Sequence, residues 1–320
     1  MNKRLLKHYR FGKTFAQINR SVRSRRKAIE KIRKLYKNSD LVHKGCNLCG
    51  GGIFTLVSEG DRYGFDLSKQ FCNQCGLIQT YPALSKKFHK EFYGHYYRPL
   101  YLKSSKVDYQ SLINEQSVKG EKYLDYFMSN GLKDVLGEIS VIEIGCSSGG
   151  TLRTLRPYVK SVRGCDLDIE AIAFSKKTFD LNVEVASLPS TLPDGKKLFI
   201  MSHVLEHVCD PLETLKKLRS LMGEGDYLFL AVPGINMVAK GDYKHDLRRY
   251  FHIAHVTDFT ASTLIAMTGY AGFKMLVVDE EIKGLFEPGK VVAWPKCNDK
   301  LIAENIQRIE KTYHGHFPHL

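Results

Sequence analysis

The chain has 320 residues, a length typical of about two domains. Hydrophobic residues make up 43% of it and charged residues 26%, which excludes a disordered chain and supplies apolar material for a sizeable core. No apolar run approaches the ~18 residues that a membrane span requires. The first residues are also too densely charged for a secretory signal. We therefore expect a cytoplasmic protein.

The formal net charge of +14 is concentrated at the N-terminus. Residues 1–40 hold 14 Lys and Arg against two acids, whereas the other 280 residues are almost neutral. Apolar residues recur there at a helical spacing, and they are Phe11, Phe15, Ile18, Val22, Ile29, Ile32 and Tyr36. We expect a basic amphipathic helical arm that packs on the body or a partner protein, or docks on an anionic membrane surface, peripheral to the inner membrane face. Nucleic acid is a less favoured partner, because aromatic residues are not interleaved with the basic ones.

Four of the eight cysteines form two C-x2-C pairs that are separated by 22 residues: Cys46, Cys49, Cys72 and Cys75. Two such turns can direct four thiolates at one tetrahedral Zn²⁺, so the spacing predicts a closed, structural zinc site. The alternative is a pair of redox or disulfide turns, which is less favoured in a cytosolic chain. Residues 53–57 and 77–82 read as strands that could pair, as in a zinc ribbon.

An aromatic-rich stretch, residues 92–101, follows the second cysteine pair. It either covers the mouth of an active site or packs between two domains, and the sequence favours neither alternative. We predict a zinc ribbon plus aromatic linker at 41–105, after the basic arm at 1–40.

Beyond residue 105, strands alternate with helices until a final pair of strands. Strands are predicted at 140–144, 161–165, 198–202, 226–232, 273–279 and 290–294, and helices at 109–130, from 151, at 211–222 and near 259–270. This order predicts an α/β domain over residues 106–295, with a mostly parallel sheet and one antiparallel strand. A C-terminal tail follows at 296–320.

A glycine-rich turn, EIGCSSGG (143–150), links a predicted strand to a helix start, which brings the backbone close to a nucleotide ligand. Asp166 ends the next strand, 21 residues after Gly145, where a carboxylate can accept hydrogen bonds from both ribose hydroxyls. The turn lacks the G-x-G-x-x-G spacing of dinucleotide binders. Glu143 is poorly placed against a pyrophosphate and suits a cationic group, such as the ammonium of S-adenosylmethionine. NAD is therefore the less favoured cofactor.

Together with GCDLD (164–168), SHVLEHVCDP (202–211) and VPG (232–234), this turn resembles a class I S-adenosylmethionine-dependent methyltransferase. The resemblance implies a Rossmann-like, seven-stranded, mostly parallel sheet. The cofactor-binding residues that we predict are Glu143, Gly145, Cys146, Gly149, Asp166, Leu167, Ser187 and Ser202. Ser147 departs from the commonest family pattern, which has a glycine there, and this bears on how closely the backbone approaches the ligand.

A narrower resemblance covers residues 46–295. The two C-x2-C-G turns, an FY…YR..Y segment and LEH..DP are similar to zinc-ribbon methyltransferases of sugar, polysaccharide and natural-product biosynthesis. This resemblance implies a small-molecule or glycan-precursor acceptor, such as a nucleotide sugar. Relatives that methylate carbon 3 of keto-deoxysugars carry a sizeable extra C-terminal domain, so we favour O-methylation of a sugar over C-methylation.

A hydroxyl nucleophile needs a base, and three candidates follow the strand at 198–202: His203, Glu206 and His207. We predict that His207 is the base and that His203 lies nearer the cofactor. The alternative is that Glu206 and His207 cap and brace the following helix.

A second polar cluster lies in the long connection after the strand at 226–232. His245 or His255 could be the true base there, and Arg248 or Arg249 could hold a substrate phosphate through two hydrogen bonds. The alternative is a solvated polar loop.

Two rival functions stay open. An RNA methyltransferase would grip RNA with the basic arm and the ribbon, and its binding would weaken steeply with salt. A degenerate domain kept as a binding scaffold is disfavoured by the intact Glu143, Gly145, Gly149 and Asp166.

Overall fold

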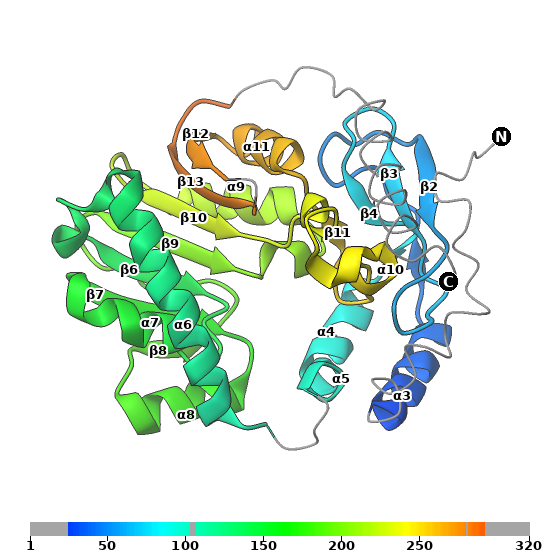
Figure 1. The fold of residues 1–320 in the computed structure, drawn as a ribbon, viewed down its shortest axis with the longest axis horizontal. Coiled ribbons are helices and arrows are strands. Elements are labelled where there is room, and N and C mark those ends of the chain that lie inside the picture. Colours follow the sequence, from blue (N-terminus) through cyan, green and yellow to red (C-terminus); the bar gives the residue numbers. More distant parts are fainter. Residues whose placement is uncertain (1–24, 103–106, 280, 292–320) are drawn as a thin grey trace.

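The computed structural model describes residues 25–102, 107–279 and 281–291, and it is built around a seven-stranded sheet (Figure 1). The strand order is β12-β13-β10-β9-β6-β7-β8. The bounds are β6 (Ser140–Ile144), β7 (Ser161–Asp166), β8 (Val183–Val185), β9 (Lys197–Ser202), β10 (Tyr227–Ala231), β12 (Phe273–Val278) and β13 (Lys283–Pro288). The five strands that lie side by side in the order β8-β7-β6-β9-β10 are all parallel. Strand β13 lies between β10 and β12 and is antiparallel to both. The predicted mostly parallel sheet with one antiparallel strand is confirmed.

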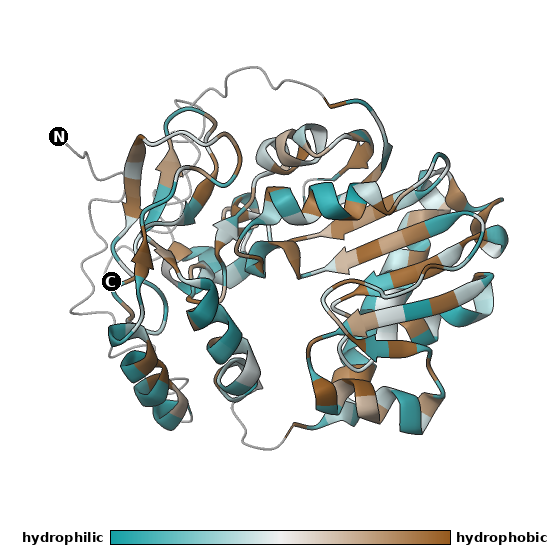
Figure 2. Ribbon diagram, turned by 180° about the vertical axis from the view of Figure 1, so that it is seen from behind, coloured by the Kyte–Doolittle hydropathy of each residue, from teal (hydrophilic) through white to brown (hydrophobic). Residues whose placement is uncertain are grey.

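Helices cover both faces of this sheet, as its apolar strands require. One face carries α6 (Tyr109–Phe127), α7 (Gly150–Leu155) and α8 (Ile169–Phe179), and the other carries α9 (Pro211–Ser220) and α11 (Ala261–Tyr270). Alternate side chains of β9 point to opposite faces of the sheet. Leu198 and Ile200 pack with α6. Phe199 and Met201 pack with α9 and α11. Figure 2 shows the central strands largely in brown, the colour of hydrophobic residues.

A second, four-stranded sheet carries the cysteine turns, and we call it the ribbon. Its order is β11-β4-β3-β2, all antiparallel. Its strands are β2 (Phe54–Ser58), β3 (Lys69–Cys72), β4 (Ile78–Thr80) and β11 (Thr257–Asp258), and β1 (Leu41–Val42) pairs with β5 (Ala83–Leu84) beside it. The prediction that 53–57 and 77–82 pair with each other was wrong, because β3 lies between them. The polar start of β3, Lys69-Gln70, hides this strand from a hydrophobicity pattern.

The long connection after β10 packs on the ribbon. Its short helices are η5 (Ile235–Val238), η6 (Asp242–His245) and α10 (Leu247–Tyr250). Val238, Tyr250 and neighbouring apolar residues form one cluster with Phe71 and Ile78 of the ribbon. The connection ends in β11, which adds a strand to the ribbon sheet.

Three helices cover the other end of the ribbon: α3 (Arg26–Lys37), α4 (Lys86–His95) and α5 (Tyr97–Leu102) (Figure 1). Ile29 and Ile32 of α3 are buried with Phe88 and Phe92 of α4, while basic residues of α3 such as Lys31 are exposed. The predicted apolar positions before residue 25 lie outside the described residues, as does the tail at 296–320. Within the described ranges, no helix is long and apolar enough to cross a bilayer.

Two predicted elements differ from the structure by more than two residues at a boundary. The last strand is β13 (Lys283–Pro288) rather than 290–294, of which residues 292–294 lie outside the described residues. Its glycine, charges and final proline resemble a loop, and only pairing with β10 and β12 makes it a strand. Helix α6 ends at Phe127, and a π-helical turn then reaches Leu132, with Gly131 at φ 88°.

A buried ion pair joins two strands of the ribbon, β3 and β11, across the intervening β4. Lys69 Nζ lies 2.7 Å from Asp258 Oδ2, and neither side chain is exposed (0% each). Lys69 also donates to the carbonyl oxygen of His255, at 2.6 Å. A buried charge is strongly destabilising without its partner. This pair therefore constrains how β3 and β11 lie relative to each other.

We predict that Lys69→Met lowers the free energy of unfolding by about 3–5 kcal/mol, because it leaves Asp258 charged and buried without its partner. Urea denaturation followed by circular dichroism measures this change. The matched control is Lys274→Met, which removes the exposed pair with Glu287 and should cost less than about 1 kcal/mol. Equal losses in the two variants would contradict the prediction.

Candidate active site

The glycine turn after β6 is shaped by close packing. Gly145 has φ 76°, and a Cβ there would lie 2.4 Å from Cγ2 of Val204. Gly149 has φ 80°, and its Cβ would lie 2.5 Å from Cδ1 of Leu181. Only glycine fits at either position. Ser147 also adopts a left-handed conformation, with φ 48°, at the position where the family pattern has its glycine.

Asp166, at the end of β7, holds this turn in place. One carboxylate oxygen accepts the N–H of Ser147 at 2.7 Å, and the other accepts the N–H of Asp168 at 2.8 Å. A carboxylate offers about four acceptor positions, so two remain for ribose hydroxyls. Beside it, Leu167 is 66% exposed, and Ile169 is exposed as well. This apolar surface at the carboxyl edge of the sheet fits the adenine of S-adenosylmethionine.

Glu143 supplies a buried carboxyl group below the turn. Its Oε2 is buried without a hydrogen-bond partner among the described residues. Burial raises the pKa of Glu143 to about 8, and the charge of Asp166 adds to the rise. A cationic ligand group would stabilise the ionised form. The orphaned oxygen therefore fits the ammonium of S-adenosylmethionine.

The other predicted cofactor residues have different surroundings. The Cys146 side chain is buried in the core below α7, so only its backbone faces the turn. Ser202 Oγ lies 2.6 Å from the hydroxyl of Tyr123. Ser187 is exposed, two residues beyond the end of β8.

A second group of side chains follows β9 at the same edge of the sheet. His203 has φ 54°, and its Nδ1 lies 3.4 Å from Oε1 of Glu206. The His203 side chain is 44% exposed, whereas that of Glu206 is 1% exposed. Both residues are held by the turn from β9 into η4 (Leu205–His207). Val204, in the turn after β9, packs on Gly145 of the glycine turn. His203 therefore lies next to the glycine turn.

His207 lies deeper than His203, and its side chain is 14% exposed. Its Nδ1 is 2.9 Å from the carbonyl oxygen of Ala254, and its Nε2 is 3.7 Å from Oε1 of Glu206. Burial by itself raises the pKa of Glu206, but His207, His203 and His255 together lower it to about 2.

The fold separates the histidines of the polar cluster predicted after the strand at 226–232. His255 joins His207, with ring centroids 5.0 Å apart, and His252 packs on His255 at 3.7 Å. Burial lowers the pKa of His255 to about 4 and also lowers that of His252. His245 instead lies on η6 beside Gly241. Arg249 Nε is 3.7 Å from Asp246 on the neighbouring turn.

The aromatic linker contacts both parts of the site. The hydroxyl of Tyr93 on α4 lies 3.0 Å from Nδ1 of His207 and donates to the carbonyl oxygen of Ala254. Arg98 on α5 donates to Ser147 Oγ at 2.8 Å and to Asp168 Oδ2 at 3.0 Å. The sequence analysis placed Tyr93 and Arg98 in the FY…YR..Y segment but assigned neither of them to the site. The aromatic-rich stretch was the available signal, but it did not show which side chains reach the site.

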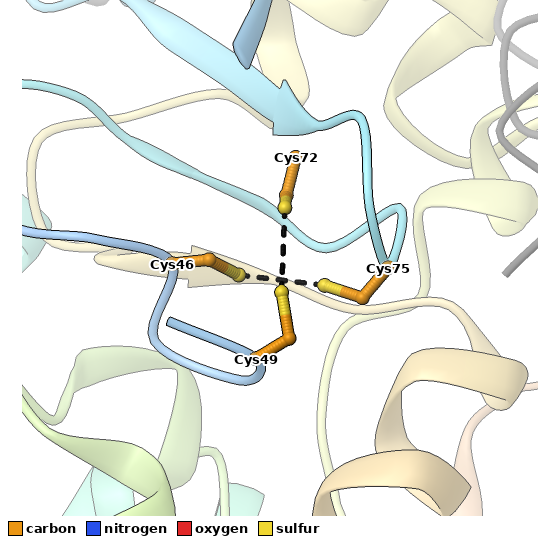
Figure 3. A group of neighbouring side chains, drawn as sticks. All are labelled: Cys46, Cys49, Cys72 and Cys75. Atoms are coloured by element: carbon orange, nitrogen blue, oxygen red, sulfur yellow. Dashed lines mark hydrogen bonds between the residues drawn. The ribbon is translucent and has the colours of Figure 1, made fainter. Parts of the chain in front are cut away.

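The four cysteines of the two C-x2-C turns converge at the edge of the ribbon (Figure 3). The sulfur atoms of Cys46 and Cys75 are 3.4 Å apart, and those of Cys49 and Cys72 are 3.5 Å apart. Four thiolates around Zn²⁺ at about 2.3 Å would lie about 3.8 Å from each other. The backbone N–H groups of Leu48 and Gly51 donate to the sulfurs of Cys46 and Cys49. The cluster therefore fits a closed metal site.

The sheet order and the site together define a class I S-adenosylmethionine-dependent methyltransferase. The sequence profile of the methyltransferase domain family matches residues 108–278, and the chain belongs to this family. No curated protein sequence matches the chain.

Solved structures that are similar to the chain include several methyltransferases. One is an S-adenosylmethionine-dependent methyltransferase from Clostridium acetobutylicum: 14% identity, TM-score 0.40, 62% of this chain and 99% of that chain covered. Another is human N-acetylserotonin methyltransferase in complex with S-adenosylmethionine, with 16% identity and a TM-score of 0.46. The match covers 57% of this chain and 55% of that chain. A third is an amino pentose methyltransferase from Micromonospora echinaspora: 9% identity, TM-score 0.41, 58% and 98% covered.

We predict that binding of S-adenosylmethionine near pH 7 releases a proton from Glu143. The free carboxyl, with a pKa of about 8, is mostly protonated at this pH, and the bound ammonium lowers that pKa. Affinity should therefore increase as the pH rises towards 8. Calorimetry in buffers of different ionisation enthalpy counts the released protons.

Glu143→Gln is the control for this prediction, because it keeps the size of the side chain but cannot ionise. It should release fewer protons than the unmodified protein and bind more weakly. Equal proton release by both proteins would contradict the assignment to Glu143.

Proposed function

We propose that the chain transfers a methyl group from S-adenosylmethionine to a sugar hydroxyl, in a nucleotide sugar or another glycan precursor. The observation that carries the proposal is the position of His203. This exposed imidazole lies beside the glycine turn and in front of the buried carboxylate of Glu206. A base in this place suits a hydroxyl acceptor, whose proton must leave during attack.

Three parts of the chain would hold the cofactor. Glu143 would bind its ammonium, Asp166 its ribose, and the exposed surface of Leu167 its adenine. When bound, S-adenosylmethionine supplies an activated methyl group on a good leaving group. The protein then has to align the acceptor and exclude water, which is mainly a problem of positioning.

In this proposal, His203 accepts the proton of the acceptor hydroxyl. The buried carboxylate of Glu206, with Oε1 3.4 Å from Nδ1 of His203, stabilises the imidazolium that forms. We favour His203 over His207, our prediction from sequence, because His207 is less exposed and its Nδ1 faces a backbone carbonyl.

The sugar acceptor is supported by the resemblance to zinc-ribbon methyltransferases and by the aromatic linker. Tyr97 and Tyr101 of α5 stack with ring centroids 5.7 Å apart, and Tyr97 also packs against His207. Tyr101 is exposed and offers an apolar face with a polar tip. Arg249 is a candidate for binding a substrate phosphate.

We further propose that the cysteine cluster binds a structural zinc ion. Cys72→Ser should then lose one zinc ion per chain and destabilise the ribbon, because metal binding contributes directly to folding in such sites. Elemental analysis and thermal unfolding measure the two effects. Cys209→Ser is the matched control, since Cys209 lies outside the cluster. Retention of all zinc by Cys72→Ser would refute the site.

The methyl acceptor can be tested with labelled S-adenosylmethionine and a panel of nucleotide sugars and RNAs. With the accepted sugar, His203→Gln should lower the rate by about 10²–10⁴-fold while the cofactor affinity is unchanged. His95→Gln, at an exposed position of α4, should have no effect. Methylation of RNA, weakening steeply with salt, would overturn the sugar proposal, and a new carbon–methyl bond in the product would overturn O-methylation.

A further inference from the structure

The carboxylate of Glu206 is in an unusual state for a charged group. Its side chain is 1% exposed, and neither oxygen has a hydrogen-bond partner among the described residues. A buried carboxylate without hydrogen bonds is costly unless a cation lies next to it. The nearest groups are imidazoles, at 3.4 Å for His203 and 3.7 Å for His207.

The hydrogen bonds of His207 determine which ring nitrogen faces Glu206. A carbonyl oxygen can only accept, and Tyr93 donates its own proton to that of Ala254, so we assign the ring proton of His207 to Nδ1, as a second donor to Ala254. In the neutral ring, Nε2 then presents a lone pair towards a carboxylate oxygen 3.7 Å away. Two electron-rich atoms in this position repel each other unless a positive ion lies between them.

His255 completes the group from a separate loop. Its ring is buried, and its Nδ1 lies 3.5 Å from Oδ1 of Asp258, which is itself fixed by Lys69. Histidine ligands of metal ions commonly have a carboxylate or a backbone carbonyl at their other ring nitrogen, which orients the ring. His255 has the first arrangement and His207 has the second.

We propose that Glu206, His207 and His255 form a second metal site, separate from the cysteine cluster, for a divalent first-row transition ion. One ligand atom from each residue lies within 4.8 Å of the others. The 3.7 Å between Glu206 and His207 is close to the about 3.4 Å between ligands of a tetrahedral ion. Two imidazoles and one carboxylate suit zinc, cobalt or iron(II) and leave coordination positions open.

This site goes beyond the proposed methyl transfer and does not require it. The His203 side chain is 44% exposed, whereas His252 and His255 are buried. A base at the exposed His203 does not exclude an ion held by Glu206, His207 and His255. The experiment below uses no methyl acceptor, so failure of either proposal leaves the other intact.

The test is a titration of the full chain, with its cysteine cluster loaded with zinc, by Co²⁺. We expect one Co²⁺ per chain, visible d–d absorption without sulfur-to-cobalt charge transfer, and full retention of the cysteine-bound zinc by elemental analysis. Glu206→Gln and His255→Gln should each weaken Co²⁺ binding at least about tenfold. The matched controls, Glu213→Gln and His95→Gln, alter exposed residues and should leave it unchanged.

Retained zinc reports that each variant is folded. Should either buried variant fail to fold, histidine-ring NMR of the unmodified protein replaces it: Co²⁺ must shift the resonances of His207 and His255 and leave those of His43 and His95 in place. Absence of Co²⁺ uptake, uptake with thiolate charge transfer, or equal uptake by folded variants would overturn the metal site. A proton shared between Glu206 and its neighbouring histidines would then explain the cluster.

Discussion

The buried pair of Lys69 and Asp258 is the interaction on which the arrangement of the site depends. It links β3 to β11, the ribbon strand that follows His255, and Lys69 also donates a hydrogen bond to the carbonyl oxygen of His255. Two unexposed charges stabilise the fold only when they stay together, so relative movement of these segments is costly. The ribbon is thereby coupled to the histidines through a chain of direct contacts that ends at His207.

Two buried carboxylates give the site two different electrostatic environments. The pKa of Glu143 is raised to about 8, because burial outweighs the lowering effects of Thr151 and Lys119. The pKa of Glu206 is lowered to about 2, because imidazoles surround an equally buried group. One fold therefore keeps one acid ready for a cationic ligand and another ionised beside the proposed base. The two acids lie towards the same edge of the sheet, because β6 and β9 are adjacent parallel strands whose carboxyl ends share that edge.

The aromatic linker connects these environments rather than merely separating two folded units. From α4, Tyr93 reaches His207, and from α5, Arg98 reaches Ser147 in the glycine turn. The serine at this position thus has a function of its own: its hydroxyl receives a donor from the linker, which a glycine could not do. A single short segment therefore contacts both the glycine turn and the histidines, and it can fix their positions relative to each other.

The sequence by itself determined those features whose chemistry lies within a few consecutive residues. The paired cysteines, the glycine turn with Asp166, and the alternation of strands and helices all follow from local spacing, and they sufficed to predict the fold and the cofactor class. Tertiary structure decided which distant residues meet. His255 joins His207 across 48 positions of the chain, and β3, β11 and β13 exist as strands only through their partners. Such contacts depend on packing and pairing between separate segments, and the order of residues within one segment does not record them.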